Sequence, residues 1–180
     1  MKIPGKALIL EACDASVSFD QASGEKASAR LNMVAYSGGI IKGHWHWDDL
    51  ALDLSGIMLP KAKYPILESH DTSAKIGFTG KPIVGADLRI DPESTVFVST
   101  PQSEEFQRLS AEGFPFEASI RVKPLAIERV AEGAMVDVNG IKLKGPGTVF
   151  RKWVFVEASV CTLTCPSPAW AGKSQSFRFN

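Results

Sequence analysis

Apolar and polar residues alternate over short stretches along most of the chain, with the period of two that is typical of β-strands. Gly, Pro, Asn and Asp punctuate these stretches. Residues 14–29, rich in Ser, Ala, Asp, Gln and Gly, are predicted to form a loop. The strands 83–90 and 94–99 are expected to pair through a connection at Asp91-Pro92. The alternation predicts strands over residues 1–12, 30–42, 64–70, 75–79, 83–90, 94–99, 114–123, 125–130 and 149–163.

A helical pattern is clear in only one segment, residues 99–113. Thr100 is suited to cap this helix, Pro101 to occupy its first position, and Gly113 to end it. Leucines one turn apart also predict a short helix over residues 47–54, with an aspartate as its cap. Helices are therefore few in the predicted fold.

A tight hairpin is predicted at Asn139-Gly140, because this dipeptide suits the turn that joins two antiparallel strands. Many short strands and few helices favour a mainly β (α+β) fold, a closed or partly closed β-barrel with a few peripheral helices. At 180 residues, the chain is expected to form one domain over residues 1–166. Residues 167–180 are predicted to be a loosely ordered tail that could lead to a removed or processed segment.

Charge and hydropathy exclude several classes of partner. The 20 basic and 20 acidic side chains cancel, which argues against nucleic-acid binding as the main activity. No apolar run approaches the ~20 residues that a membrane-spanning helix needs. The apolar run near the N-terminus is also too short for a secretory signal. We therefore expect a cytosolic protein without nucleic-acid or membrane partners.

The cysteine and histidine spacings do not favour a metal site. Cys161 and Cys165 are close in sequence, but Cys13 is remote and no second ligand pair lies near, so structural thiols are expected. His44 and His46 share a strand face, yet two ligands are too few, and a half-buried aromatic strand or loop is the better interpretation. A phosphate-binding glycine loop is also absent from the sequence, so we predict no metal and no cofactor.

Ser119 lies in an apolar strand pattern. Alternation places Ala118 and Ile120 on one face of this strand, and Ser119 with Arg121 on the other. A serine close to a general base is a potential nucleophile, whereas a solvent-facing strand serine is the alternative. The flanking residues are not the glycines of the nucleophile elbow found in α/β-hydrolases, so that motif is excluded.

His70 ends the strand predicted over residues 64–70 and begins a turn predicted over residues 70–73. Imidazole is the usual general base near neutral pH, and the chain has only 3 histidines. The alternative is a hydrogen-bonded surface histidine, with Asp71 shaping the turn. His70 is therefore the candidate base.

Glu157 is an acid inside an otherwise apolar strand. Both faces of residues 153–160 are largely apolar, so the carboxylate is expected to be buried. Burial is costly unless the charge is paired or hydrogen-bonded. A histidine that becomes cationic during a reaction is one suitable partner, and an arginine such as Arg151 is another. The residue pattern leaves both partners open.

Several segments together resemble the prohead (capsid maturation) serine proteases of tailed phages, which are related in fold to the herpesvirus assemblins. They cover roughly residues 30–165 and follow the order of the family. The resemblance implies an assemblin-like barrel and a serine protease. The matching segments are Asp53–Ile57, Pro65–Asp71, Ile76-Gly77, Gly113–Ile120 and Val149–Val160.

Position by position, the resemblance implies that Ser119 is the nucleophile, His70 the general base and Glu157 the acid that orients the base. An acid as third member follows the phage branch, because the assemblins have a histidine there. Many phage members have a glycine two places after the serine, where this chain has Arg121. The candidate oxyanion donors are backbone amides near the serine, Arg121 and Arg151.

The implied substrates and partners are the major capsid protein, the scaffold protein and the protease itself, inside the immature prohead in the host cytoplasm. Assemblins become active by dimerising, so the resemblance also implies a homo-oligomer. Two alternatives remain from the sequence. One is a non-catalytic capsid-assembly module with the same residues, and the other is a serine hydrolase that acts on small esters.

Overall fold

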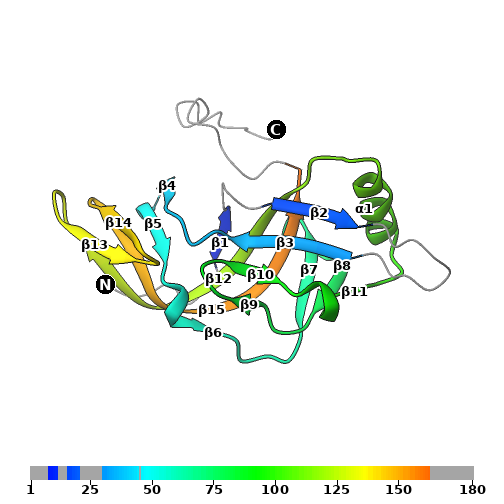
Figure 1. Ribbon diagram of the computed structural model, residues 1–180, viewed down its shortest axis with the longest axis horizontal. Helices are drawn as coiled ribbons and strands as arrows, with labels where there is room; N and C mark the ends of the chain where they lie inside the picture. Colours follow the sequence, from blue (N-terminus) through cyan, green and yellow to red (C-terminus); the bar gives the residue numbers. More distant parts are fainter. Residues whose placement is uncertain (1–7, 12–15, 21–29, 45, 163–180) are drawn as a thin grey trace, which may run out of the picture.

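A computed structural model of the chain describes residues 8–11, 16–20, 30–44 and 46–162 (Figure 1). The described residues form a mainly β fold with one α-helix, so the predicted fold class is confirmed. The predicted tail over residues 167–180 lies outside the described residues, as do Cys13 and Cys165.

The strands form three sheets. The nine-stranded sheet contains β1 (Leu8–Glu11), β4 (Ile41–His44), β5 (Asp48–Leu52), β6 (Ile57–Met58), β7 (Tyr64–Glu68), β8 (Asp71–Thr79), β11 (Val96–Phe97), β12 (Glu117–Val130) and β15 (Gly147–Cys161). The four-stranded sheet contains β2 (Ser16–Asp20), β3 (Arg30–Tyr36), β9 (Ile83–Val84) and β10 (Leu88–Ile90). A separate hairpin pairs β13 (Met135–Val138) with β14 (Ile141–Lys144). The helices are α1 (Pro101–Ala111) and the 3-10 turns η1 (Leu54–Gly56) and η2 (Pro92–Ser94).

The long antiparallel ribbon of β12 and β15 forms the centre of the nine-stranded sheet (Figure 1). The main path of that sheet runs β1-β12-β15-β7-β8-β11, and β7 lies parallel to β15. Its two end strands, β1 and β11, do not pair with each other, so the described strands form no closed barrel. The described strands therefore do not confirm the predicted closed or partly closed barrel, since the sheet ends at β11, a strand of two residues.

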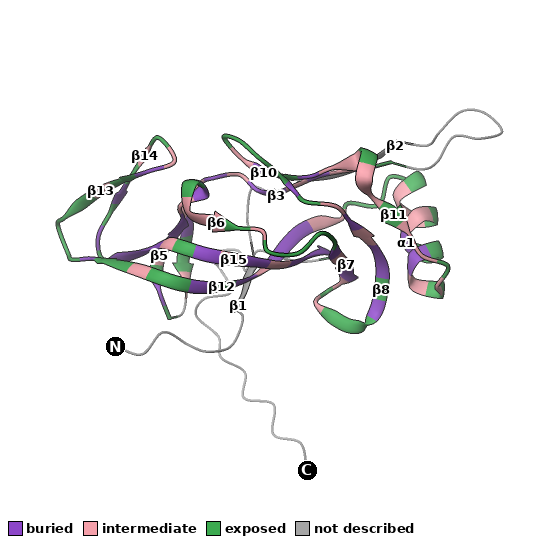
Figure 2. Cartoon of the chain, turned by 90° about the horizontal axis from the view of Figure 1, so that it is seen from below, coloured by how far each residue is buried: buried purple, intermediate pink, exposed green. Residues whose placement is uncertain are grey.

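The four-stranded sheet lies over one face of the nine-stranded sheet (Figure 2), and the two share one apolar core. Complete burial of one large apolar side chain stabilises a fold by about 1.5–3 kcal/mol. This common core therefore stabilises the packing of the β12–β15 ribbon against the second layer. Its members include Leu31, Met33, Leu88, Ile90, Ile120, Val122, Trp153 and Phe155.

The short helix predicted over residues 47–54 is wrong. Residues 48–52 form β5, which pairs parallel to the first residues of β15 and antiparallel to β4. Leu50 and Leu52 are both completely buried, with Ala51 between them buried against the β13–β14 hairpin. A strand covered on both faces has a continuous apolar run, which sequence periodicity alone does not separate from a helix.

The expected pairing of strands 83–90 and 94–99 is also wrong. Residues 83–90 break into β9 and β10, which pair with each other, and β10 pairs with β3. In contrast, β11 pairs with β8 in the other sheet. The predicted loop over residues 14–29 contains β2, which pairs with β3. Alternation shows which segments are extended, but it does not show which strands pair with one another.

The strongest local signals are confirmed. The hydroxyl of Thr100 caps α1 by accepting from the backbone N–H of Ser103, and Gly113 follows the helix with a φ of 82°. Asn139 and Gly140 both have positive φ in the predicted hairpin turn. The predicted strands 114–123 and 125–130 are one strand, β12, with register shifts beside Pro124 where the ladder tolerates a missing N–H.

The described residues contain no helix that is both long and apolar enough to cross a membrane. Nor does this part of the chain bring together three or more His, Cys, Asp or Glu side chains in an arrangement suited to a metal ion. His44 ends β4, and its ring Nδ1 accepts from the backbone N–H of His46. The thiol of Cys161 is buried at the end of β15.

Candidate active site

Four polar side chains meet across the central ribbon. In the antiparallel register of β12 and β15, Ser119 is opposite Ser159 and Arg121 is opposite Glu157. Residues two apart on a strand, and residues directly opposite on neighbouring strands, share one face of the sheet. The intervening residues Ala118, Ile120, Ala158 and Val160 are completely buried in the apolar core on the other face. The register thus collects the polar residues on one side.

The hairpin between β7 and β8 brings His70 to this face. Glu68 pairs with Asp71, so Ser69 and His70 form a two-residue turn. Since β7 is parallel to β15, the turn lies beside the end of that strand, and the N–H of Ser69 donates to the carbonyl of Val160 (2.9 Å). The turn predicted over residues 70–73 is therefore misplaced, because Asp71 already belongs to β8.

The backbone of this turn is unusual. Ser69 and His70 have φ values of 47° and 61°, the left-handed region that such turns normally fill with Asn-Gly. A residue with a Cβ atom costs about 1–3 kcal/mol in a sparsely populated backbone region, and strain of this kind collects at functional sites. The surrounding contacts must therefore hold the turn in place.

His70 joins Glu157 to Ser119. Its ring Nδ1 lies 2.5 Å from Oε1 of Glu157, and its Nε2 lies 2.7 Å from Oγ of Ser119. With a proton on Nδ1, the imidazole donates to the carboxylate and accepts from the hydroxyl. The three residues that the sequence singles out are thus connected by two hydrogen bonds. In sequence, Ser119 lies 49 positions and Glu157 lies 87 positions from His70.

Two further side chains complete the site. The hydroxyl of Ser159 donates to Oε2 of Glu157 (2.8 Å) and accepts from the backbone N–H of His70 (3.1 Å). Nη2 of Arg121 donates to the carbonyl of His70 (2.9 Å), and its Nε lies 3.4 Å from Oε1 of Glu157. Sequence reasoning missed the role of Ser159. The alternation of Glu157-Ala-Ser159 was the signal that could have found it.

The site is almost closed to solvent. Ser119 is 0% exposed, and the side chains of His70 and Glu157 are 8% and 2% exposed. The alternatives of a solvent-facing serine and a surface histidine are therefore wrong. A buried carboxylate loses its hydration, and here His70, Ser159 and Arg121 replace those water contacts.

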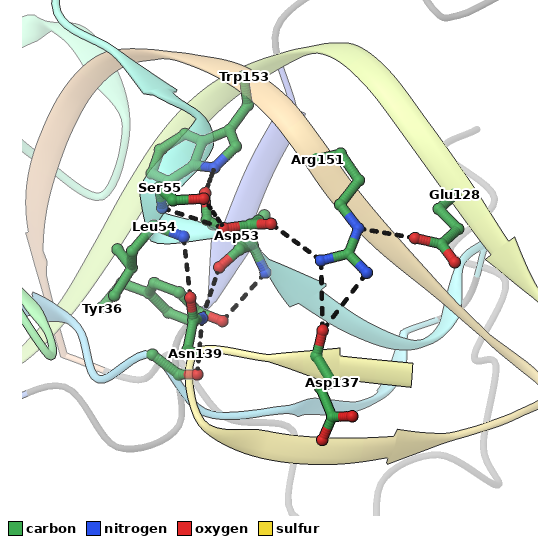
Figure 3. A network of polar contacts seen from close by, with 11 residues as sticks. Tyr36, Asp53, Leu54, Ser55, Glu128, Asp137, Asn139, Arg151 and Trp153 are labelled. Carbon is green, nitrogen blue, oxygen red and sulfur yellow. Dashed lines mark hydrogen bonds and ion pairs between the residues drawn. The ribbon is translucent and has the colours of Figure 1, made fainter. Parts of the chain in front are cut away.

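Arg151 lies in a different network, which Figure 3 shows. It donates to Asp53 (2.9 Å) and Glu128 (2.7 Å). Along β15 it is eight residues from Ser159, roughly 26 Å at the rise of a strand. Arg151 is therefore neither the partner of Glu157 nor close to Ser119, and the structure contradicts its candidacy as an oxyanion donor. Of the two candidate arginines, only Arg121 is brought to the site, and both of its contacts there go to the His70 and Glu157 side.

This arrangement can move a proton. A hydroxyl, an imidazole and a carboxylate in series allow the imidazole to take the hydroxyl proton while the carboxylate stabilises the resulting cation. Comparison with known proteins finds no protein-family model, no curated protein and no solved structure that matches the chain. The functional inference therefore depends on the site geometry and on the sequence resemblance.

Proposed function

We propose that the chain is a serine endopeptidase in which Ser119 is the nucleophile, His70 the general base and Glu157 the residue that orients the base. The observation that carries the proposal is the pair of short contacts on opposite sides of the His70 ring, 2.5 Å to Glu157 and 2.7 Å to Ser119. The order of these residues along the chain is that of the phage prohead proteases, which the sequence resembles.

The reaction follows from these roles. Oγ of Ser119 attacks the carbonyl carbon of the peptide bond while its proton moves to Nε2 of His70. The C–N bond then breaks, and His70 gives this proton to the leaving amine. Water attacks the acyl-enzyme with His70 again as base, which releases the carboxylic acid and restores the hydroxyl. Glu157 remains ionised and stabilises the imidazolium in both steps.

The substrates in this proposal are the major capsid protein, the scaffold protein and the protease itself, in the prohead within the host cytoplasm. These substrates and this location rest on the sequence resemblance alone. The same holds for an assemblin-like architecture and for a homo-oligomer. An assay with capsid or scaffold precursor separates the endopeptidase from a small-ester hydrolase, which would cleave chromogenic esters and leave the precursors intact.

One observation favours the non-catalytic assembly module instead. Ser119 is completely buried, and a protein substrate reaches a nucleophile only if the site opens. In the non-catalytic alternative, the three side chains are simply a buried polar network that holds β7, β12 and β15 together. The two functions differ in whether the Ser119 hydroxyl reacts.

A fluorophosphonate probe tests this difference. The purified chain should form one covalent adduct, which peptide mapping places on Ser119, because the hydroxyl attacks phosphorus as His70 takes its proton. Ser119→Ala should abolish the adduct and keep the fold. Ser73→Ala, at an exposed serine of β8, should label like the parent. If prolonged incubation gives no adduct, or gives one at another residue, the assignment of Ser119 is wrong.

A further inference from the structure

The contacts around Glu157 have an unusual symmetry. Each carboxylate oxygen is shared with a side chain that also holds the main chain of His70. Ser159 contacts Oε2 of Glu157 and accepts from the N–H of His70. Arg121 lies next to Oε1 and donates to the carbonyl of His70. The imidazole itself contacts Oε1, so the acid is connected to the histidine through its ring, its N–H and its carbonyl.

This symmetry coincides with the strained turn. His70 adopts a φ of 61° without being glycine, and the contacts of Ser159 and Arg121 with its N–H and carbonyl hold the main chain at the residue that carries the ring. The Nε2 contact to Ser119 is 2.7 Å, and a displacement of about 1 Å can slow a positioned reaction about 100-fold. The residues that hold the His70 main chain therefore control the distance between base and nucleophile.

We propose that Arg121 and Ser159 are positioning residues that fasten the His70 main chain to the Glu157 carboxylate and thereby set the contact between base and nucleophile. We call these two side chains the His70 clamp. The proposal rests on the proposed function, because it takes His70 as the base. It assigns Arg121 to the base and not to the oxyanion, since both of its contacts in the site are on the His70 side.

The two members of the clamp contribute differently. Ser159 is neutral and completely buried, so it orients the carboxylate without changing its charge. Arg121 is 24% exposed and places a positive charge next to Glu157, which offsets part of the cost of burying the carboxylate. Loss of the Ser159 hydroxyl should thus weaken only the placement of His70 and Glu157. Loss of Arg121 should weaken that placement and also remove a positive charge beside the carboxylate.

Five variants of the full chain test the clamp, two that remove its members, two controls and one conservative replacement. Ser159→Ala and Arg121→Gln remove its two members. Thr148→Val and Arg129→Gln are matched controls, because they remove a buried hydroxyl from β15 and a hydrogen-bonded arginine from β12 at a distant contact, Arg129 to Thr148 (2.8 Å). Thermal melts first establish which variants fold. Arg121→Gln carries the test alone if Ser159→Ala does not fold.

The first measurement is the rate of fluorophosphonate labelling at Ser119 as a function of probe concentration. We expect the maximal labelling rate of each clamp variant to fall about 10- to 100-fold, with the half-saturating probe concentration unchanged. Arg121→Lys, which keeps the charge but not the forked geometry, should recover part of the rate. The controls should label like the parent. Parent rates in both clamp variants, or equal losses in the controls, would overturn the proposal.

The second measurement does not need activity. In protein labelled with ¹⁵N-histidine, only 3 imidazoles contribute, and the Nδ1 proton of His70 should give a downfield resonance from its contact with Glu157. This resonance should broaden or disappear in the clamp variants and persist in the controls. If the parent does not label, the proposed function fails. If the resonance persists in both clamp variants, the clamp fails, whatever the labelling shows.

Discussion

Two polar networks are built on β15, one around Glu157 and one around Arg151. Figure 3 shows the second of these networks. Both join segments far apart in sequence, but Glu157 is 2% exposed, whereas Arg151 and Glu128 are 32% and 44% exposed. In the site, the imidazole of His70 lies between a carboxylate and a hydroxyl, so the imidazole can accept the hydroxyl proton. In the Arg151 network, the guanidinium lies between Asp53 and Glu128, two acids that simply pair with it.

Three groups of the second network have shifted pKa values, and each keeps one protonation state near neutral pH. They are Asp53, Arg151 and Tyr36. Burial raises the pKa of Asp53, but hydrogen bonds from Ser55 and Arg151 outweigh it and hold that pKa below its ordinary value. Burial lowers the pKa of Arg151, but its bonds to Glu128 and Asp53 leave it above the ordinary value. Burial raises the pKa of Tyr36 to about 12. This network is therefore suited to holding the fold together.

Asn139 shows how the second network holds the molecule together. Its side chain accepts from the N–H of Leu54 (2.9 Å) and donates to the carbonyls of Leu52 (2.7 Å) and Gly38 (3.0 Å) (Figure 3). One residue thus ties the β13–β14 hairpin to β5, to η1 and to the segment that follows β3. The two networks differ in that only the one around Glu157 contains an imidazole placed to exchange a proton with a hydroxyl during a reaction. Substitutions in the two networks should separate activity from stability.

The largest expected effect is on activity, from Glu157→Gln. A glutamine keeps the shape of the side chain but does not stabilise the imidazolium, so the maximal rate of probe labelling at Ser119 should fall about 10²- to 10⁴-fold. Probe binding should change little, and the free energy of unfolding should change by at most about 1–2 kcal/mol. Rapid-mix labelling and urea unfolding measure both quantities. An unchanged labelling rate would remove Glu157 from the catalytic set.

The next effect is on stability, from Asn139→Gly. Glycine adopts the left-handed turn at this position, whose φ is 51°, so the substitution isolates the side-chain contacts. Loss of three hydrogen bonds should lower the free energy of unfolding by about 2–4 kcal/mol. The folded variant should still label at the parent rate. A large loss of labelling in the folded variant, with little loss of stability, would reverse the assignment of this network to the fold.

The smallest expected effect is on the pH dependence of the free energy of unfolding, and it comes from Tyr36. Its hydroxyl donates to the carbonyl of Gly39 and accepts from the N–H of Leu52 in a buried position. The folded pKa of about 12 lies above the ordinary value of 10.0 for tyrosine, so the hydroxyl ionises first in the unfolded chain. The raised pKa of Tyr36 therefore adds about 2–3 kcal/mol to the free energy of unfolding. This contribution is complete below pH ~10 and is lost as the pH rises towards ~12.

Urea unfolding of the parent and of Tyr36→Phe at a series of pH values measures this contribution. The difference between the two proteins in free energy of unfolding should shrink with rising pH across this window, because phenylalanine does not ionise. A difference that stays constant over the same range would mean that Tyr36 does not control the alkaline stability of the network.

Local sequence patterns predicted much of the secondary structure. The cap at Thr100, the turn at Asn139-Gly140 and the long last strand all depend on neighbouring residues, and the structure contains each of them. The same patterns failed at β5, where packing on both faces hides the period of the strand. They also failed for the partners of β10 and β11, since strand pairing joins segments that no local pattern connects.

The pattern of residues along the chain was enough to show which side chains could take part in chemistry. Alternation separated Ser119 from the apolar face of its strand and identified Glu157 as a buried acid. That these residues meet is visible only in the folded chain, because it depends on the register of β12 against β15 and on the parallel placement of β7. The folded chain also shows that Arg121 and Ser159 contact the site while Arg151 does not. This is because the face on which a side chain lies is set by its own strand, whereas its partners are set by which strands pair and in what register.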